Sequence, residues 1–327
     1  MKKDELKKKL KSFSKEELEY LAGELYRLTP KKVREEKGYE ELLEHLPELS
    51  AAGKAFQKGM TPEDTDALLK EAAEFIMDVK AGYYFSANRY VTRAQRYRWR
   101  TYLKDLVRRL NRIKAEGDEG RKAANCLCGI YEVMAVGTHR WLFPSQEPFY
   151  SCGMKQIEFF EQVARRLLQV STGRITLHRL LTLAVEPDLG SPFAHHDDYL
   201  RVLCGLLKTP DSKESAVEEA MALVEESRKR RDQKTAAEAR EAYAFLVLLL
   251  ELRLCEYEVG IDYYQENSSR SPGERTKILL RELRRLDLKE QWLEIIARAY
   301  RQNVSLSEEY EEIWKYLRNE GTFPEEH

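Results

Sequence analysis

The residues best suited to bind a ligand lie between positions 83 and 114, where basic and aromatic side chains are interleaved. From position 89 to 114 there are ten basic residues and a single acid, Asp105, which gives a local charge of about +9. Arginine side chains suit phosphate, and exposed aromatic rings can stack on nucleic-acid bases. The composition of this segment therefore predicts an anion-binding surface.

Helical spacing sorts these residues onto two faces. One face is apolar and consists of Trp99, Tyr102, Leu103, Leu106, Leu110 and Ile113. The opposite face, which we name the basic stripe, consists of Arg93, Arg96, Tyr97, Arg100, Lys104 and Arg108, and Arg89 joins it if the helix begins early. The alternative interpretation is structural, with the stripe solvated or paired with acidic residues of the same chain, such as those at 214–226.

A second group that could support chemistry is His196-Asp197, with His195 before it and His178 upstream. Adjacent His and Asp residues are typical of all-α, metal-dependent phosphohydrolases of the HD type, which also need a distant His and a distant Asp. His139 or His178 would supply the former, and no later aspartate stands out as the latter. The alternative is that the aspartates cap a helix at the positive end of its dipole. Because the ligand set is incomplete, we predict no metal and no cofactor.

The five cysteines favour buried, reduced thiols over a zinc site or disulfides. Cys126 and Cys128 have one residue between them, whereas paired zinc-binding cysteines usually have two to four residues between them. An aromatic cluster that begins at Trp141 and ends at Tyr150 would either line a ligand groove or form the core at a helix–helix joint.

No phosphate-binding loop, dinucleotide-binding glycine pattern, serine-hydrolase, zinc-protease or kinase motif is present. The net charge is −1, so any affinity for nucleic acid must come from a local patch. The longest apolar run, 242–250, is too short to span a bilayer and predicts a helix that is buried on all sides. Together with a charged N-terminus, these features predict a cytoplasmic protein with no membrane partner.

The helices that position these residues are marked by local signals. A capping box at Ser14 and Glu17 starts the first, and Thr61-Pro62 starts the second. Apolar spacing then predicts one long helix over 92–115. Further helices are predicted over 119–142, 154–170, 174–185, 197–207, 213–232, 235–264, 273–286, 288–302 and 307–319. No segment alternates with a period of two for long enough to indicate a strand.

These elements predict an all-α fold, a multi-helix array of antiparallel helical hairpins that resembles an irregular α-solenoid. We expect an N-terminal helical segment at 1–46, a linker at 47–60 and the main array at 61–327, either as one body or as two lobes joined near 186–196. The predicted function is a non-enzymatic scaffold that binds another protein through the array. One alternative is a module that binds RNA or DNA through 89–114, and a second is the HD-type phosphohydrolase.

Three stretches, at 3–26, 91–110 and 153–160, resemble parts of uncharacterised bacterial cytosolic proteins that are wholly helical. The resemblance implies a helical cytoplasmic protein. It implies no activity and assigns no role to any residue.

Overall fold

The computed structural model describes residues 13–29, 62–186 and 196–324, and within them it contains 15 helices and no strand. The predicted all-α fold class is therefore confirmed. The chain divides into two compact units, 1–61 and 62–327, which we describe separately. Several predicted features lie outside the described residues. They are the linker at 47–60, most of the joint at 186–196, His195 and Thr61. No described helix is long and apolar enough to cross a membrane.

The first unit contains one described helix, α2 (Lys15–Leu28). Its predicted capping box is present: the Ser14 hydroxyl accepts a bond from the Glu17 amide at 3.2 Å, and the Glu17 carboxylate accepts one from the Ser14 amide at 2.7 Å. These reciprocal bonds satisfy two amides at the helix start that have no partner within the helix, so local sequence is enough to fix where α2 begins.

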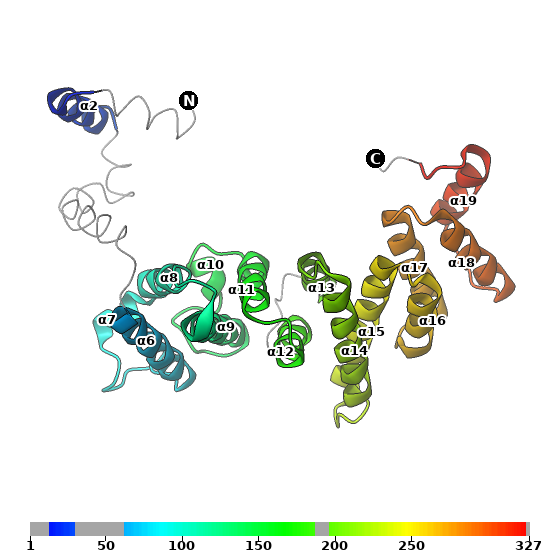
Figure 1. Cartoon of the computed structure of the whole chain (residues 1–327), viewed down its shortest axis with the longest axis horizontal. Coiled ribbons are helices and arrows are strands. Elements are labelled where there is room, and N and C mark those ends of the chain that lie inside the picture. The colour runs from blue at the N-terminus through cyan, green and yellow to red at the C-terminus, as the bar shows by residue number, and fades with distance from the viewer. Residues whose placement is uncertain (1–12, 30–61, 187–195, 325–327) are drawn as a thin grey trace. The chain divides into compact units, whose positions relative to one another are not determined.

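The first half of the second unit packs around α9. Here α6 (Pro62–Lys80), α8 (Trp99–Leu110) and α9 (Gly117–His139) pack against one another, and α9 also contacts α10 (Pro148–Ser151) and α11 (Gln156–Val170) (Figure 1). Aromatic side chains fill the centre of this group, and Tyr131 on α9 contacts the rings of Phe149, Phe159 and Phe160. The predicted aromatic cluster thus contributes Phe149 to the core.

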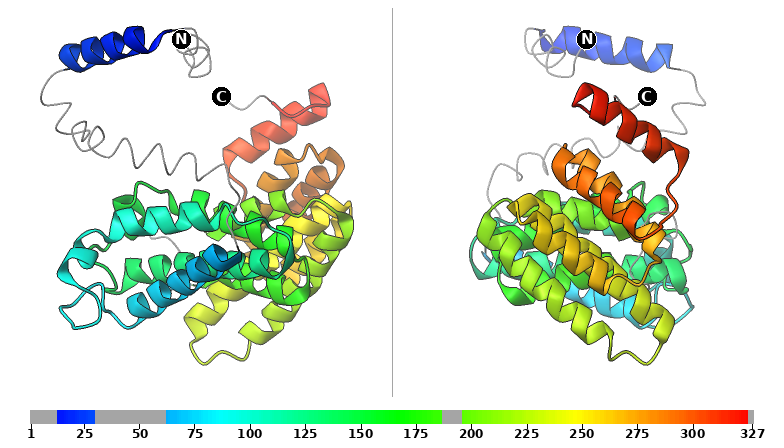
Figure 2. Two further views of the ribbon diagram at one scale, coloured as in Figure 1. Left: turned by 60° about the vertical axis from the view of Figure 1, so that its left-hand side comes forward. Right: turned by 90° about the vertical axis from the view of Figure 1, so that its right-hand side faces the viewer.

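The remaining helices also pack largely on neighbours in sequence. The chain continues through α12 (Arg174–Val185), α13 (His196–Leu206), α14 (Pro210–Ser227), α15 (Gln233–Leu254), α16 (Tyr257–Asn267), α17 (Pro272–Arg285), α18 (Lys289–Arg301) and α19 (Glu308–Glu320). The most extensive contacts join α14 to α15, α15 to α16 and α17 to α18 (Figure 2). Every residue of the apolar run 242–250 in α15 is buried, as predicted.

Two predicted long helices are wrong, because each is two helices. The predicted helix 92–115 breaks at Arg98, whose φ of −92° and ψ of 8° lie outside the α region, into α7 (Arg93–Tyr97) and α8. The predicted helix 235–264 ends at Cys255, whose φ of 67° is left-handed, and α16 then packs against α15. Gly260 permits that packing, because a Cβ there would lie 2.7 Å from the Glu251 Cβ.

Candidate anion-binding site

The site begins with the turn between α6 and α7, which the side chain of Asn88 holds in shape. Its amide nitrogen donates to the carbonyls of Tyr83 at 2.6 Å and Ser86 at 2.7 Å, and its oxygen accepts from the amides of Tyr90 at 2.9 Å and Val91 at 2.7 Å. The Tyr83 and Tyr90 rings stack with centroids 4.6 Å apart. Asn88 is not among the residues that the sequence predicts for this site, although asparagine in a short polar turn is a recognised signal for such bonding.

The second element, α7, is a short helix with no buried residue. Its start is fixed by a capping box, in which the Thr92 hydroxyl accepts from the Gln95 amide at 3.3 Å and the Gln95 side chain accepts from the Thr92 amide at 2.9 Å. Arg93 is exposed, and the Tyr97 side chain is 79% exposed. Because α7 buries no residue, the exposed side chains of Arg93 and Tyr97 can face a ligand.

The third element, α8, is anchored by its apolar face. Trp99 is only 1% exposed and stacks on Phe143 with centroids 4.5 Å apart. Leu103, Leu106 and Leu110 are fully buried on the same face, as the helical spacing predicts. The opposite side of α8 therefore exposes Arg100, Lys104 and Arg108.

These three elements and Pro144, which precedes α10, line an open pocket of about 630 Å³, which we name the arginine pocket. It is lined by Tyr84, Phe85, Ala87, Arg93, Arg96, Tyr97, Trp99, Arg100 and Pro144. At its edge the exposed Phe85 ring contacts the exposed ring of Trp141, with centroids 5.4 Å apart. Four of the predicted stripe residues thus line one pocket. Phe85 belongs to the aromatic and basic segment 83–114 in which the sequence predicts an anion-binding surface, whereas nothing in the sequence indicates that Pro144 would join them.

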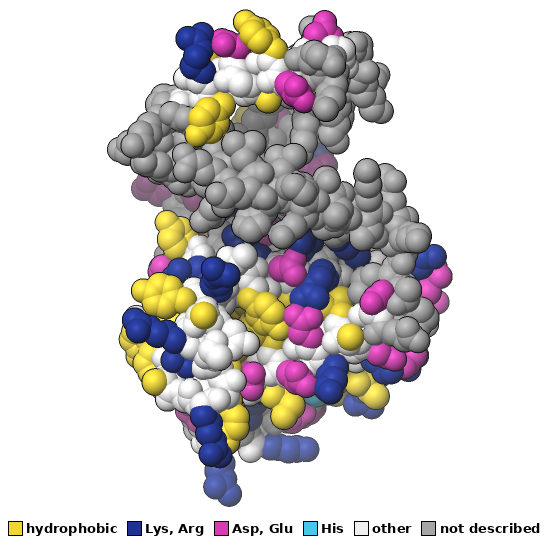
Figure 3. Space-filling view, turned by 90° about the vertical axis from the view of Figure 1, so that its left-hand side faces the viewer, with side chains coloured by type: hydrophobic (Ala, Val, Ile, Leu, Met, Phe, Trp, Pro, Cys, Tyr) yellow, Lys and Arg dark blue, Asp and Glu magenta, His cyan; other side chains and the backbone are white. Residues whose placement is uncertain are grey.

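The remaining stripe residues lie outside this pocket. Lys104 and Arg108 continue along the exposed side of α8, and Arg89 lies in the preceding turn, where it donates to the Tyr90 hydroxyl at 3.0 Å. Figure 3 shows this end of the second unit, where Lys and Arg side chains lie around hydrophobic ones on the surface.

Within the described part of the chain, the arginines of the pocket have no acidic partners. Among the described residues, none of Arg93, Arg96 and Arg100 forms an ion pair: Arg96 donates to the Val91 carbonyl, and Arg100 lies over the Trp99 ring, 5.5 Å from its centroid. Arg108 pairs with Asp105, one turn away. In the part of the chain that is described, the acids of 214–226 pair with none of these residues, since α14 packs on α12 and α15.

Arg109 has a different role, because it lies outside the stripe and fixes α8 to α6. Its guanidinium donates two bonds to the Glu71 carboxylate, at 2.7 and 2.8 Å. This hydrogen bonding lowers the pKa of Glu71, although burial acts in the opposite direction. The bidentate pair sets the position of the helix that carries Arg100 and Lys104.

We expect Glu71→Gln to lower the free energy of unfolding at neutral pH by about 0.5–1 kcal/mol, since the pair is partly exposed. The folded-state pKa of Glu71 is below its ordinary value of 4.5, so the stabilisation is complete above that pH and is lost as the pH falls through the lowered value. Urea unfolding at neutral and acidic pH measures this difference. Glu74→Gln, on the same helix but exposed, is the control, and equal effects of the two variants at neutral pH would contradict the assignment.

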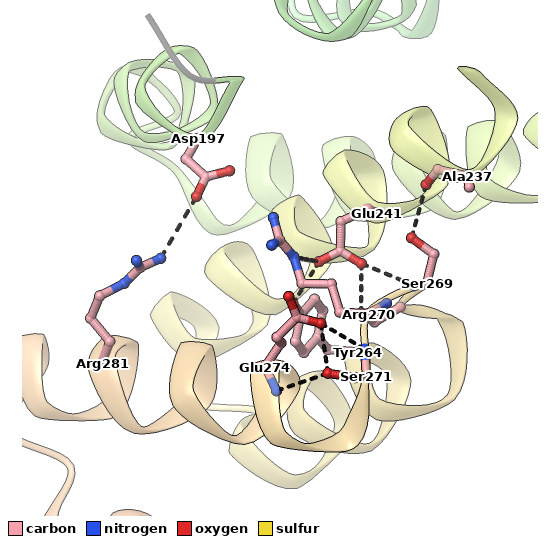
Figure 4. Close-up of polar contacts among 10 residues, drawn as sticks. Asp197, Ala237, Glu241, Tyr264, Ser269, Arg270, Ser271, Glu274 and Arg281 are labelled. Atoms are coloured by element: carbon pink, nitrogen blue, oxygen red, sulfur yellow. Dashed lines mark hydrogen bonds and ion pairs between the residues drawn. The ribbon is translucent and has the colours of Figure 1, made fainter. Parts of the chain in front are cut away.

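The groups predicted as alternative metal ligands have other partners. His196 contacts the Ala184 carbonyl through Nδ1 at 3.0 Å, and Asp197 pairs with Arg281 at 3.6 Å (Figure 4). His178 contacts Glu219 at 2.7 Å. In the described parts of the chain, no group of three or more His, Cys, Asp or Glu residues is arranged to hold a metal ion.

The cysteines are mostly buried and carry no zinc-like arrangement among the residues described. The Cys126 thiol donates to the Leu69 carbonyl at 3.9 Å, and the Cys128 thiol lies 3.6 Å from the Glu132 carboxylate. Burial raises the pKa of Cys152 to about 11 and that of Cys204 to about 12. These thiols therefore stay protonated at neutral pH, which makes them poor nucleophiles and poor metal ligands.

Fold and site together define an all-α protein with an exposed pocket that combines arginine and aromatic side chains. Neither a family model, nor a curated protein, nor a solved structure matches the chain. The predicted resemblance is thus supported only as far as the helical fold, and its bacterial and cytosolic parts stay predictions.

Proposed function

We propose that this protein binds single-stranded nucleic acid through the arginine pocket and the exposed side of α8. The observation that carries the proposal is the composition of the pocket, where the guanidinium groups of Arg93, Arg96 and Arg100 and the exposed rings of Phe85 and Tyr97 lie together. Guanidinium groups match the geometry of phosphate, and aromatic rings stack on bases of any sequence.

A single strand fits this site better than a duplex does. Bases in a duplex are stacked inside the helix, whereas those of a single strand can enter a pocket and contact aromatic rings. A volume of about 630 Å³ is within the range of small-ligand sites, so one nucleotide can enter while the strand continues over Lys104. The earlier scaffold hypothesis relies on the fold class and surface charge alone, and it stays a prediction.

The test is to measure binding to labelled oligo(dT) and oligo(rU) at several salt concentrations, with fluorescence anisotropy as the signal. Four phosphate contacts, by the three pocket arginines and Lys104, predict a slope of about −2.8 for log affinity against log salt, at about −0.7 per contact. A hairpin duplex should bind more weakly, and polyglutamate should not compete. Polyglutamate that competes as well as oligo(dT) would contradict the proposal and favour an acidic protein partner.

Tyr97→Ala separates base stacking from charge attraction at the same site. Loss of one stacked base should weaken binding by about 1–3 kcal/mol, and the salt slope should not change because no phosphate contact is removed. The control is Tyr316→Ala, an exposed tyrosine on α19. Equal affinities of the two variants would exclude Tyr97 as a stacking residue.

A further inference from the structure

An exposed tryptophan lies at the edge of the arginine pocket. Trp141, in the connection of α9 and α10, is 54% exposed, whereas the other three tryptophans of the chain, Trp99, Trp292 and Trp314, are buried or partly buried. A single exposed apolar side chain is ordinary, but Trp141 contacts a second exposed ring, that of Phe85. The two rings form an apolar patch that adjoins a charged pocket, which is a feature of ligand-binding surfaces.

The connection that carries Trp141 is held in one conformation. The Leu142 amide donates to the Arg140 carbonyl at 2.8 Å, and this bond turns the chain at Trp141. Two residues later, Phe143 is fully buried and stacks on Trp99. The backbone is therefore fixed around Trp141, and a ligand that contacts the exposed ring does not have to order a loop first.

Phe85 connects Trp141 with the arginine pocket. Its ring lies 5.4 Å from the Trp141 ring, between centroids, and it lines the pocket together with Tyr97. Exposed aromatic surface thus continues from the pocket to Trp141 at its edge. If one nucleotide of a strand occupies the pocket, the next nucleotide along the strand can reach Trp141.

The charges beside these rings restrict the kind of occupant. Arg93, Arg96 and Arg100 line the same pocket, and they form no ion pair within the described part of the chain. A second copy of this chain would bring like charges together, which opposes association. An acidic peptide supplies negative charge but no row of planar bases, whereas a single strand supplies phosphates for the guanidinium groups and bases for the rings.

We propose that Trp141 is a second base-stacking site, which holds the nucleotide next to the one in the arginine pocket. This inference rests on the proposed function and extends it, because the site then takes two successive nucleotides of a single strand. One base lies against Tyr97 in the pocket, and its neighbour stacks on the exposed face of Trp141, which Phe85 supports from the pocket side. Since every base has a face that can stack, the site accepts strands of any sequence.

The test follows the intrinsic tryptophan fluorescence of the full chain during titration with unlabelled oligo(dT), beside the anisotropy measurement with the labelled strand. A base that stacks on the exposed ring should quench its emission. Trp141→Phe should lose most of this quenching but keep most of the affinity, because phenylalanine still provides a ring. Trp141→Ala should bind about tenfold more weakly, with an unchanged salt slope.

The matched control is Tyr300→Ala. Tyr300 is 45% exposed on α18 and also contacts a second ring, that of Trp314, so it resembles Trp141 in exposure and surroundings. This variant should keep both the affinity and the quenching. Thermal unfolding of each variant verifies that it is folded.

A double variant shows whether Trp141 and Tyr97 hold different bases. If they do, the fold losses of Trp141→Ala and Tyr97→Ala should multiply when the two substitutions are combined, because independent effects add as free energies. If the double variant binds no more weakly than the weaker of the single variants, both rings act on one base and the second stacking site is excluded.

The outcomes separate this inference from the proposed function. No binding of oligo(dT) in the anisotropy measurement overturns the proposed function and this inference with it. Binding without quenching, or equal affinities of Trp141→Ala and Tyr300→Ala, overturns the second stacking site alone. Polyglutamate that quenches the fluorescence as strongly as oligo(dT) also overturns it and indicates an acidic protein partner.

Discussion

Reversing the charge of the three pocket arginines, with Arg93→Glu, Arg96→Glu and Arg100→Glu together, should reduce affinity for oligo(dT) by about a thousandfold. Three charge-assisted contacts at about 1.5 kcal/mol each account for that loss. The slope of log affinity against log salt should become shallower by about 2.1, which is three times 0.7. Anisotropy titrations at several salt concentrations measure both changes.

The matched control reverses three basic residues elsewhere, at Lys229, Arg231 and Lys234. These side chains are exposed at the connection of α14 and α15, and the control changes the net charge by the same amount. If both triple variants lose affinity equally, the effect belongs to the net charge and the arginine pocket is not the binding site. Arg96 also donates to the Val91 carbonyl, so thermal unfolding must first show that the pocket variant is folded.

Glu241→Ala should lower the free energy of unfolding by about 3 kcal/mol, the largest stability effect that we expect from one substitution. The Glu241 carboxylate accepts bonds from the Tyr264 hydroxyl at 2.6 Å, the Ser268 hydroxyl at 2.5 Å, the Ser269 amide at 3.0 Å and the Arg270 guanidinium at 2.8 Å (Figure 4). Removing it leaves the hydroxyl of the buried Tyr264 without this acceptor, and among the described residues the connection of α16 and α17 then keeps only the bond from the Ser269 hydroxyl to the Ala237 carbonyl of α15.

Urea unfolding of Glu241→Ala and Glu241→Gln measures this effect. The glutamine variant keeps an acceptor oxygen and should lose less stability than the alanine variant. Glu238→Ala, one turn earlier on α15 and exposed, controls for the change in helix propensity. A loss for Glu241→Ala no greater than that for Glu238→Ala would show that the network contributes little.

Local sequence signals predicted the ends of elements and the faces of helices. Ser14 and Glu17 form the expected capping box, and Trp99, Leu103 and Leu106 are buried on the side that helical spacing assigns to them. The basic stripe residues Arg100 and Lys104 lie exposed on the opposite side. These features depend on interactions within a turn or two of helix, so a single sequence contains all the information that they need.

The same signals failed where backbone conformation depends on packing. The breaks at Arg98 and Cys255 interrupt segments whose apolar spacing continues through them, so periodicity alone predicted one helix in each place. At the first break Trp99 stacks on Phe143, and at the second Gly260 packs against Glu251. Each of these contacts joins residues that the local pattern treats as independent.

The sequence by itself thus determined the helical fold class, the capped helix starts and a helix with one basic and one apolar side. Only the tertiary structure decided that Pro144 completes a pocket with Phe85, Arg93 and Arg100, and that Glu241 accepts bonds from Tyr264, Ser268 and Arg270. The physical reason is the separation along the chain of the residues that interact. Helix formation is governed by neighbours along the chain, whereas pockets and buried charges depend on which distant side chains exclude water from the same volume.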